Sequence, residues 1–288
     1  MEGFGTSPVF RFYREALGKE NIRLAVVEEN DPLDFVGKDD IVLLRTASPS
    51  LIETIEEKGI ISTAESNLTY NQVGDKVYLA NFLKKFGIRV PRQFKMEELE
   101  EGKTYFVKPR YGSDSMGITT KCICRSIAEV REQVARLEAQ IGEVVIEEFI
   151  DGIDCTVACV KNSVGYSTGS FSTAAISVEC EETEGIQTRD CKVGFKEYCS
   201  KVDHILNEYL ESRAILICAA LGIRHHARID FRFSKTDEKG ELYVIDVNLL
   251  PGLGPIDHFS KCFLLAKNQS YTDTIKSIVN SATRYENG

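Results

Sequence analysis

The sequence predicts an α/β fold, of the α+β kind and with more than one lobe, on three observations. Short apolar runs typical of buried strands alternate with amphipathic helical segments along most of the chain. A chain of 288 residues is long enough for two or three lobes that each bury a core. Residues 227–254 read as a hairpin whose apolar strands carry charged side chains. We therefore interpret the other segments, in chain order, as the support for this hairpin.

The first 70 residues follow a strand–helix–strand order, which predicts a small doubly wound lobe. Residues 22–27 and 41–44 are typical of buried parallel strands, and residues 50–58 of a helix with Ser50 as its N-cap. Arg45 directly follows the second strand, at the sheet edge where open α/β sheets bind ligands. An ordinary surface arginine is an equally good interpretation.

Two lysines stand at the ends of predicted elements. Lys76 lies near the start of a helix predicted to run to Gly87, and Lys108 ends a strand that begins at Tyr105. The glycine- and serine-rich stretch 112–117 follows, and its backbone amides could turn toward an anion. The P-loop pattern GxxxxGK[ST] is absent from the sequence. The stretch therefore predicts either a flexible cover over phosphates or an ordinary hairpin loop.

Adjacent acidic residues interrupt the apolar run 144–150. Glu147 and Glu148 would be costly to bury unless they accept hydrogen bonds, for which an adenine amino group and ribose hydroxyls are suitable donors. An edge strand with outward-facing acids is the alternative. The later segments read as a strand, a long loop, a helix and, after the hairpin, a terminal helix: residues 154–160, 166–200, 202–221 and 273–282.

Apolar and polar residues alternate in both strands of the hairpin. In the first strand, Ile229, Phe231 and Phe233 form an apolar face, with charged residues between them. In the return strand, period two places four residues on one face: Leu242, Val244, Asp246 and Asn248. Both strands are therefore expected to be buried in a sheet although each carries polar side chains.

Two carboxylates are predicted to meet in this hairpin. A turn centred near Glu238 sets Asp230 opposite Asp246, with Arg228 and Asn248 close by. Like charges paired across strands destabilise a sheet, and a Mg²⁺ ion, which prefers oxygen ligands, would remove that cost. If the strands lay at an exposed edge, both aspartates would be solvated and would need no metal.

Composition limits the class of protein. The formal charge of −9 argues against nucleic acid or an anionic membrane as the main partner. The sequence has no run of about twenty apolar residues and no signal-peptide pattern at its start. Its 9 cysteines form no CxxC pair and lie mostly in apolar runs, where reduced cysteine behaves as a small hydrophobic residue. We expect a soluble cytoplasmic protein with reduced cysteines.

The segments, in this order, resemble the ATP-grasp superfamily, closest to its D-alanine–D-alanine ligase branch of carboxylate–amine ligases. The stretches that carry the resemblance span most of residues 70–282: DKVYLANFLKKFGIRVP, FVKPRYGSDSMGI, VVIEEFIDGIDCTV, ARIDFRF and YVIDVNLLPGLG, with SYTDTIKSIVNSA at the tail. The resemblance implies an ATP-grasp fold with an N-terminal Rossmann-like pre-ATP-grasp lobe. Residues 1–72 would form that lobe, 73–146 the small ATP-grasp lobe with the phosphate-covering loop, and 147–288 the large lobe with the magnesium site.

The resemblance also implies a role for each matching residue. The residues that match the ATP-binding set are Lys76, Lys108, Gly112, Ser113, Ser115, Met116, Gly117, Glu147, Glu148, Phe149, Ile150 and Asp154. The lysines and glycine-rich loop would hold phosphates, the hinge 147–150 adenine, and Asp154 ribose. Asp230, Asp246 and Asn248 match the ligands of two Mg²⁺ ions, with Mn²⁺ as the alternative ion. Arg228 matches the arginine that stabilises the tetrahedral intermediate.

The sequence departs from the ligase branch at the substrate end. The glycine-rich signature with an amino-binding glutamate has no counterpart before Arg45. Asp257 stands where a serine would hold the carboxylate of the terminal D-alanine, and an acid would repel that carboxylate. Asp257 could instead be the N-cap of a helix that begins at His258. The basic residue expected in the loop after the hinge has three candidates: Arg189, Lys192 and Lys196.

The resemblance implies an ADP-forming ligase that joins a carboxylate to an amine through an acyl phosphate. We expect small-molecule or peptide substrates, amino acid in kind, and a substrate other than D-alanine. One alternative is a nucleotide-binding regulatory module without ligase turnover, and another is an ATP-grasp phosphotransferase. We expect neither nucleic acid nor membrane as a partner, and a homodimer is left open.

Overall fold

The structure of the chain is a computed structural model that describes residues 8–18, 24–25, 33–112, 115–162, 170–180, 183, 185–188, 191, 197–234 and 240–283. Several sequence expectations fall on residues outside these ranges: Ser113, Arg189, Lys192, Lys196, the turn centre Glu238 and most of the strand at 22–27.

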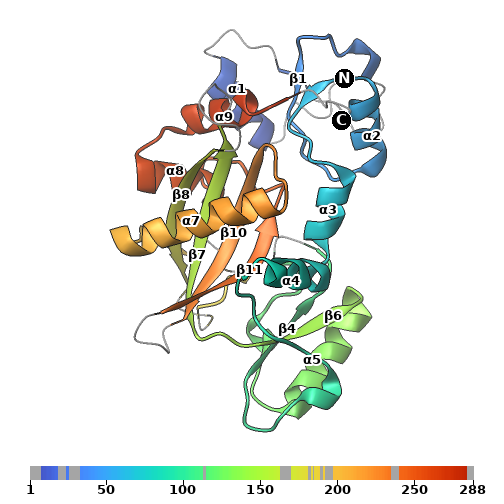
Figure 1. Cartoon of the computed structure of the whole chain (residues 1–288), viewed down its shortest axis with the longest axis vertical. Helices are drawn as coiled ribbons and strands as arrows, with labels where there is room; N and C mark the ends of the chain where they lie inside the picture. The colour runs from blue at the N-terminus through green and yellow to red at the C-terminus, as the bar shows by residue number, and fades with distance from the viewer. Residues whose placement is uncertain are drawn as a thin grey trace.

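The described strands form three sheets, in agreement with the predicted α/β class (Figure 1). The two-stranded sheet is parallel and consists of β1 (Ile41–Val42) and β2 (Ile61–Ser62), so the strand at 41–44 pairs with a strand that was not predicted. The four-stranded sheet has the order β3 (Gln93–Phe94), β6 (Val144–Glu148), β4 (Tyr105–Pro109) and β5 (Ile123–Cys124). The five-stranded sheet has the order β11 (Glu241–Asn248), β10 (His226–Ser234), β7 (Gly152–Lys161), β8 (Phe171–Glu179) and β9 (Tyr198–Lys201).

Helices flank each sheet. Their bounds are α1 (Pro8–Gly18), α2 (Pro49–Glu57), α3 (Asn67–Gly74), α4 (Lys76–Lys85), α5 (Ile127–Gln140), α7 (His204–Ala220), α8 (His258–Lys267) and α9 (Tyr271–Asn280), with short 3-10 turns at Leu33–Phe35, Met96–Glu98 and Thr120–Cys122. None of the helices in the described part of the chain combines the length and apolar composition needed to cross a membrane.

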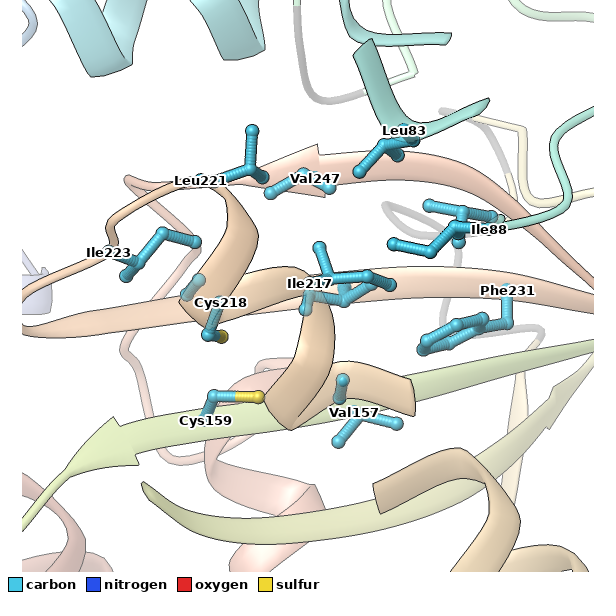
Figure 2. Close-up of a cluster of buried hydrophobic side chains, with 14 of the residues drawn as sticks. Leu83, Ile88, Val157, Cys159, Ile217, Cys218, Leu221, Ile223, Phe231 and Val247 are labelled. Carbon is cyan, nitrogen blue, oxygen red and sulfur yellow. The ribbon is translucent and has the colours of Figure 1, made fainter. Parts of the chain in front are cut away.

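One face of the five-stranded sheet packs against α7 and α4. Figure 2 shows Ile217 and Cys218 of α7 beside Val157 and Cys159 of β7, with Phe231 of β10 in the same cluster. All five side chains are buried, with relative exposures of 0%. Burial of this apolar surface holds α7 across the sheet, and it fixes which residues of each strand face the opposite side.

The other face of this sheet packs against α8, α9 and α1, which lie together in Figure 1. Phe259 and Phe263 of α8 are buried there with Ile176 of β8. Tyr13 of α1 joins this cluster and not the separate core around Ile52 of α2. The lobe boundaries at residues 72 and 146 stay a prediction.

A β-bulge in β11 changes which residues face the site. Asp230 pairs with Asp246, as the turn position predicted, but Phe231 pairs with Val244, so Ile245 is left without a partner across the ladder. The prediction that Leu242 and Val244 share a face with Asp246 is therefore wrong. Those two apolar residues pack in the α7 core, while Asp246 lines the pocket on the other face.

The loop predicted for residues 166–200 is wrong over β8 and β9. β8 lies between β7 and β9 in the sheet, and its small residues Ala174 and Ala175 are both fully buried. A strand buried on both faces has no apolar–polar alternation, which explains why period two did not reveal it. Strand β8 pairs with β7 along the edge of β7 that faces away from β10.

Two helix predictions need adjustment. The helix predicted from residue 71 is two helices, because Asp75 interrupts them and caps α4 by accepting hydrogen bonds from the amides of Val77 (2.9 Å) and Tyr78 (3.2 Å). Lys76 is therefore the first residue of α4. Helix α2 begins after Ser48 and not after Ser50.

The structure joins Cys180 and Cys191 in a disulfide, so the prediction that every cysteine is reduced is wrong for this pair. The remaining seven are free. The two cysteines are 11 residues apart, and no local sequence pattern indicated that they pair.

Candidate functional site

One pocket lies between the four-stranded and five-stranded sheets, and it gathers most of the residues predicted from the sequence. The predicted residues that line it are Lys76, Lys108, Gly112, Ser115, Met116, Glu147, Glu148, Phe149, Ile150, Asp154, Arg228, Asp230 and Asp246. Further lining residues include Tyr111, Ile186, Gln187, Arg232 and Ile245. Gly117 and Asn248 are not among the lining residues.

Lys76 enters the pocket from the first turn of α4. Its Nζ donates a hydrogen bond to the carbonyl of Gly112 (2.7 Å) and lies 4.0 Å from Oδ1 of Asp246. Asp75 fixes this turn, because its carboxylate caps α4 and also accepts hydrogen bonds from Arg110 Nε (2.9 Å) and Nη2 (2.6 Å). Lys76 thus links the glycine-rich loop to the carboxylate end of the pocket.

Lys108 is buried at the base of the pocket. Its Nζ lies 2.7 Å from Oε2 of Glu147 and donates to the carbonyl of Ile245 at 3.1 Å, the residue that the bulge leaves unpaired. The side chains of Lys108 and Glu147 are only 8% and 5% exposed. Glu147 is therefore neutralised by a lysine, and the edge-strand alternative for it is excluded by its burial.

The rest of the predicted adenine hinge contributes mainly its backbone. Oε1 of Glu148 accepts a hydrogen bond from the amide of Arg92 (2.8 Å). The carbonyl of Ile150 accepts from Nε of Arg232 (2.8 Å), and the ring of Phe149 lies under that guanidinium, 5.5 Å from its carbon. Arg232 therefore contacts the hinge at both Phe149 and Ile150.

Arg232 also binds the acid predicted for ribose. Its Nη1 donates to Oδ1 of Asp154 (2.7 Å) and to the carbonyl of Gly185 (2.6 Å). Burial raises the pKa of Asp154, and Arg232 opposes that rise. Nη2 of Arg232 is buried and has no hydrogen-bond partner among the described residues. A polar group of a ligand in the pocket would satisfy it.

Arg228 neutralises Asp230 directly. Its Nε and Nη2 donate to the carboxylate at 2.9 and 2.7 Å, and Oγ1 of Thr156 donates to Oδ1 of Asp230 at 2.9 Å. The repulsion predicted between Asp230 and Asp246 is therefore offset by Arg228 and, at 4.0 Å from Asp246, by Lys76. The aspartate pair does not by itself require a metal ion.

The donor set at this end nevertheless fits magnesium. Asp246 is 27% exposed at its side chain and faces Asp230 across the ladder, beside Asn248, whose Oδ1 accepts the amide of Leu250 (2.9 Å). Magnesium commonly takes one or two carboxylates and completes its shell with phosphate oxygens and water. Within the described ranges, no group of three or more His, Cys, Asp or Glu side chains is placed to hold a metal. Any ion here would therefore depend on oxygens from a bound phosphate.

A family model described as D-ala D-ala ligase C-terminus matches residues 81–280. The chain belongs to this family. Among curated members of the D-Ala–D-Ala ligase family, the chain is 30% identical to the D-alanine–D-alanine ligase of Aquifex aeolicus over 51% of this chain and 46% of that protein. It is 23% identical to the uncharacterized protein y4sG of Sinorhizobium fredii, over 80% of this chain and 68% of that one. The chain thus spans about half the length of the curated Aquifex ligase.

Solved D-Ala–D-Ala ligases share its ATP-grasp fold. A D-alanine–D-alanine ligase from Bacillus anthracis superposes with a TM-score of 0.68 at 19% identity, covering 96% of this chain and 94% of that one. The same enzyme complexed with ATP gives a TM-score of 0.64 at 23% identity, with 86% and 80% covered. The predicted ATP-grasp fold is thus confirmed.

Sequence reasoning missed several residues of the site. Arg232 alternates with Arg228 and Asp230 on the same strand, a signal that could have placed it in the pocket. Thr156 had no signal beyond its place in a predicted strand. Gln187 lies in an aperiodic segment, where position depends on contacts distant in the sequence.

We predict that Asp75→Asn lowers the melting temperature at pH 7 by removing the charge that pairs with Arg110. The Arg110 hydrogen bonds lower the pKa of Asp75 from 3.8 to about 2. A lowered folded-state pKa stabilises the fold above the ordinary value, and that stabilisation is lost as pH falls toward about 2. Asparagine also caps helices, so α4 should persist.

Thermal unfolding of both proteins from pH 7 down to acid pH checks this, and the gap between them should narrow below pH 3.8. Glu143→Gln, which removes the more exposed acid on Arg110, is the matched control with a smaller effect. A pH-independent gap would contradict the role given to the Asp75 charge.

Proposed function

We propose that the chain is an ATP-dependent carboxylate–amine ligase that forms ADP and phosphate through an acyl phosphate. One observation carries the proposal. Three cations, Lys76, Lys108 and Arg228, line the same pocket as the carboxylates of Asp230 and Asp246. Membership of the D-Ala–D-Ala ligase family supports it. The substrates are amino acids or peptides.

The proposed chemistry depends on position and charge. In phosphoryl transfer the negative charge spreads over the phosphate oxygens, and catalysis consists mostly of alignment and charge neutralisation. Lys76 approaches the pocket from α4 and Lys108 from β4 of the four-stranded sheet, and both would hold the phosphates. Magnesium, bound through Asp246, Asn248 and Asp230, would neutralise those phosphates further.

Arg228 is placed for the second half of the reaction. When an amine attacks an acyl phosphate, negative charge develops on the carbonyl oxygen, and a fixed donor stabilises it. Arg228 is 9% exposed and is held rigid by its hydrogen bonds to Asp230. A preorganised guanidinium at this point would act on the oxyanion without having to reorient.

We further propose that D-alanine is not the amine substrate. Asp257 lies on the loop that follows Asn248, and its carboxylate would repel the carboxylate of D-alanine. Helix α8 does begin at His258, but Asp257 makes no capping hydrogen bond and instead accepts the amide of Gly254 (2.6 Å). The N-cap interpretation therefore does not account for this acid.

The test is phosphate release from Mg-ATP with a panel of amino acids and short peptides, singly and in pairs. A ligase releases phosphate only when a carboxylate and an amine substrate are both present, and it forms a new amide. A stable phosphorylated product made from one substrate would show a phosphotransferase instead. Tight Mg-ATP binding without turnover across the panel would favour a regulatory module.

A further inference from the structure

A four-residue loop, 251–254, follows the end of β11 that carries Asp246 and Asn248, and charged residues hold it from two sides. Nη2 of Arg45 donates to the carbonyl of Pro251 at 2.6 Å, and Oδ2 of Asp257 accepts the amide of Gly254 at 2.6 Å. A Cβ on Gly254 would lie 2.9 Å from the same Oδ2. The loop is thus wrapped around Asp257, and Arg45 reaches it from the N-terminal lobe.

Two tyrosines complete the cluster. Tyr271, the first residue of α9, donates to the carbonyl of Leu253 at 3.0 Å. Tyr13 of α1 is 8% exposed, and its hydroxyl is buried without a hydrogen-bond partner among the described residues. Burial raises the pKa of Tyr13, the charge of Arg45 lowers it and that of Asp257 raises it. These groups, from four parts of the chain, therefore share one electrostatic environment.

Arg45 and Asp257 are not among the residues that line the pocket, but the loop that they hold begins close to a residue that pairs with Arg228. Asn248, three residues before the loop, pairs with Arg228 across the β10–β11 ladder. Burial and, after it, the charge of Arg45 together lower the pKa of His226 to about 3, so Arg45 lies within electrostatic range of the start of β10. A ligand on Arg45 and Asp257 would therefore extend from the site where Arg228 acts.

The two charges select complementary groups on a ligand. Arg45 is exposed and Asp257 is partly exposed, so solutes can reach both. Arginine binds a carboxylate through parallel hydrogen bonds, and aspartate binds an ammonium group. A ligand with an ammonium group on Asp257 avoids the repulsion that this acid exerts on a substrate carboxylate, whereas D-alanine, whose one amine is used in the amide bond, does not. The pair thus accepts a ligand that carries both charges.

The chemistry of amide formation narrows the ligand further. An ammonium group held by a carboxylate stays protonated, because the opposite charge raises its pKa. A protonated amine has no free electron pair and cannot attack an acyl phosphate. The amine that reacts must therefore be a different one from the amine that Asp257 holds.

We propose that Arg45 and Asp257 form a subsite for a diamino acid of the lysine, ornithine or 2,3-diaminopropionate class. Arg45 holds its carboxylate, Asp257 holds one protonated amine, and the second amine, unprotonated, faces the acyl phosphate beside Arg228. The unpartnered hydroxyl of Tyr13 supplies one more polar contact. This inference rests on the proposed ligase function and names its amine substrate.

Calorimetric titration of the full chain with the three diamino acids, in both enantiomers, tests the subsite. Each is compared with its monoamino counterpart (norleucine, norvaline or alanine) and with its own amide. At least one diamino acid should bind about tenfold or more tightly than both comparators, the range of one charge-assisted contact. If none does, the proposal is overturned.

Single variants test which group of the ligand each of the two charged side chains binds. In Asp257→Asn, which keeps the amide-accepting oxygen, the preferred diamino acid should bind no better than its monoamino counterpart. In Arg45→Gln it should bind no better than its amide. Tyr13→Phe should weaken binding without lowering the melting temperature, because the lost hydroxyl has no partner among the described residues. The control Arg14→Gln, an exposed neighbour on α1, should match the parent.

If Asp257→Asn or Arg45→Gln lowered the affinity for every compound by the same factor, these residues would only hold the loop in place. That result would overturn the subsite. The titrations are run with and without Mg-ADP, and ADP binding is measured in the same samples. Failure of ADP to bind would count against the proposed ligase alone. Discrimination among the amino acids without nucleotide would still report on Arg45 and Asp257.

Discussion

Asp246→Asn should nearly abolish turnover while leaving the fold intact. Asp246 is the partly exposed acid at the end of the pocket, opposite Asp230 and 4.0 Å from Lys76. The substitution keeps an oxygen but removes the charge that would bind magnesium. Loss of a partner that only supports a metal ligand costs about 10- to 100-fold, and we expect loss of a direct ligand to cost at least as much.

The measurement is calorimetric binding of ATP with and without Mg²⁺, together with ADP release. The parent should bind Mg-ATP more tightly than free ATP, and Asp246→Asn should lose most of that difference. Asp151→Asn, an exposed acid near the hinge, is the control and should behave like the parent. Turnover by Asp246→Asn at the parent rate would remove Asp246 from the metal site.

The turn position and strand period were sufficient to predict the pairing of Asp230 with Asp246, but not the register nearer the turn, where the pairing is shifted by one residue from Phe231 to Ser234. Asp230 does pair with Asp246. The error lies at Ile245, one residue before Asp246 in the chain, where a bulge reverses the faces of β11. Val244 and Ile245 are adjacent apolar residues that interrupt the alternation of β11 at this point, a signal that could have marked the bulge. The carbonyl of Ile245 accepts a hydrogen bond from Lys108 of the four-stranded sheet, a residue that is distant in the sequence.

The partners of the buried charges were the second feature of the site that local sequence patterns could not predict. The aspartate pair predicted a bound metal cation. In the structure two side chains of the chain itself neutralise the pair, Arg228 at Asp230 and Lys76 at Asp246. Likewise Glu147 was expected to need donors from a ligand and is met by Lys108. Sequence indicates that a buried charge must be compensated, whereas the identity of the partner depends on how the sheets pack.

The burial of Lys108 leads to the second large prediction, that Lys108→Ala impairs both stability and ATP use. Losing one charge-assisted phosphate contact weakens binding by roughly 1.5–3 kcal/mol. The same change leaves Glu147, 5% exposed at its side chain, without its partner, and breaking a buried ion pair this way costs about 3–5 kcal/mol. Lys121→Ala, at an exposed position after the same loop, should do neither.

A double variant separates the two effects. In Lys108→Ala/Glu147→Gln no buried charge is left unpaired, so the free energy of unfolding should recover much of what the single variant loses. ATP affinity should not recover, because the cation that would bind phosphate is still missing. Denaturant unfolding and calorimetric ATP binding measure the two quantities on the same samples. If ATP affinity returned together with stability, Lys108 would serve the fold alone, and the phosphate role would pass to Lys76.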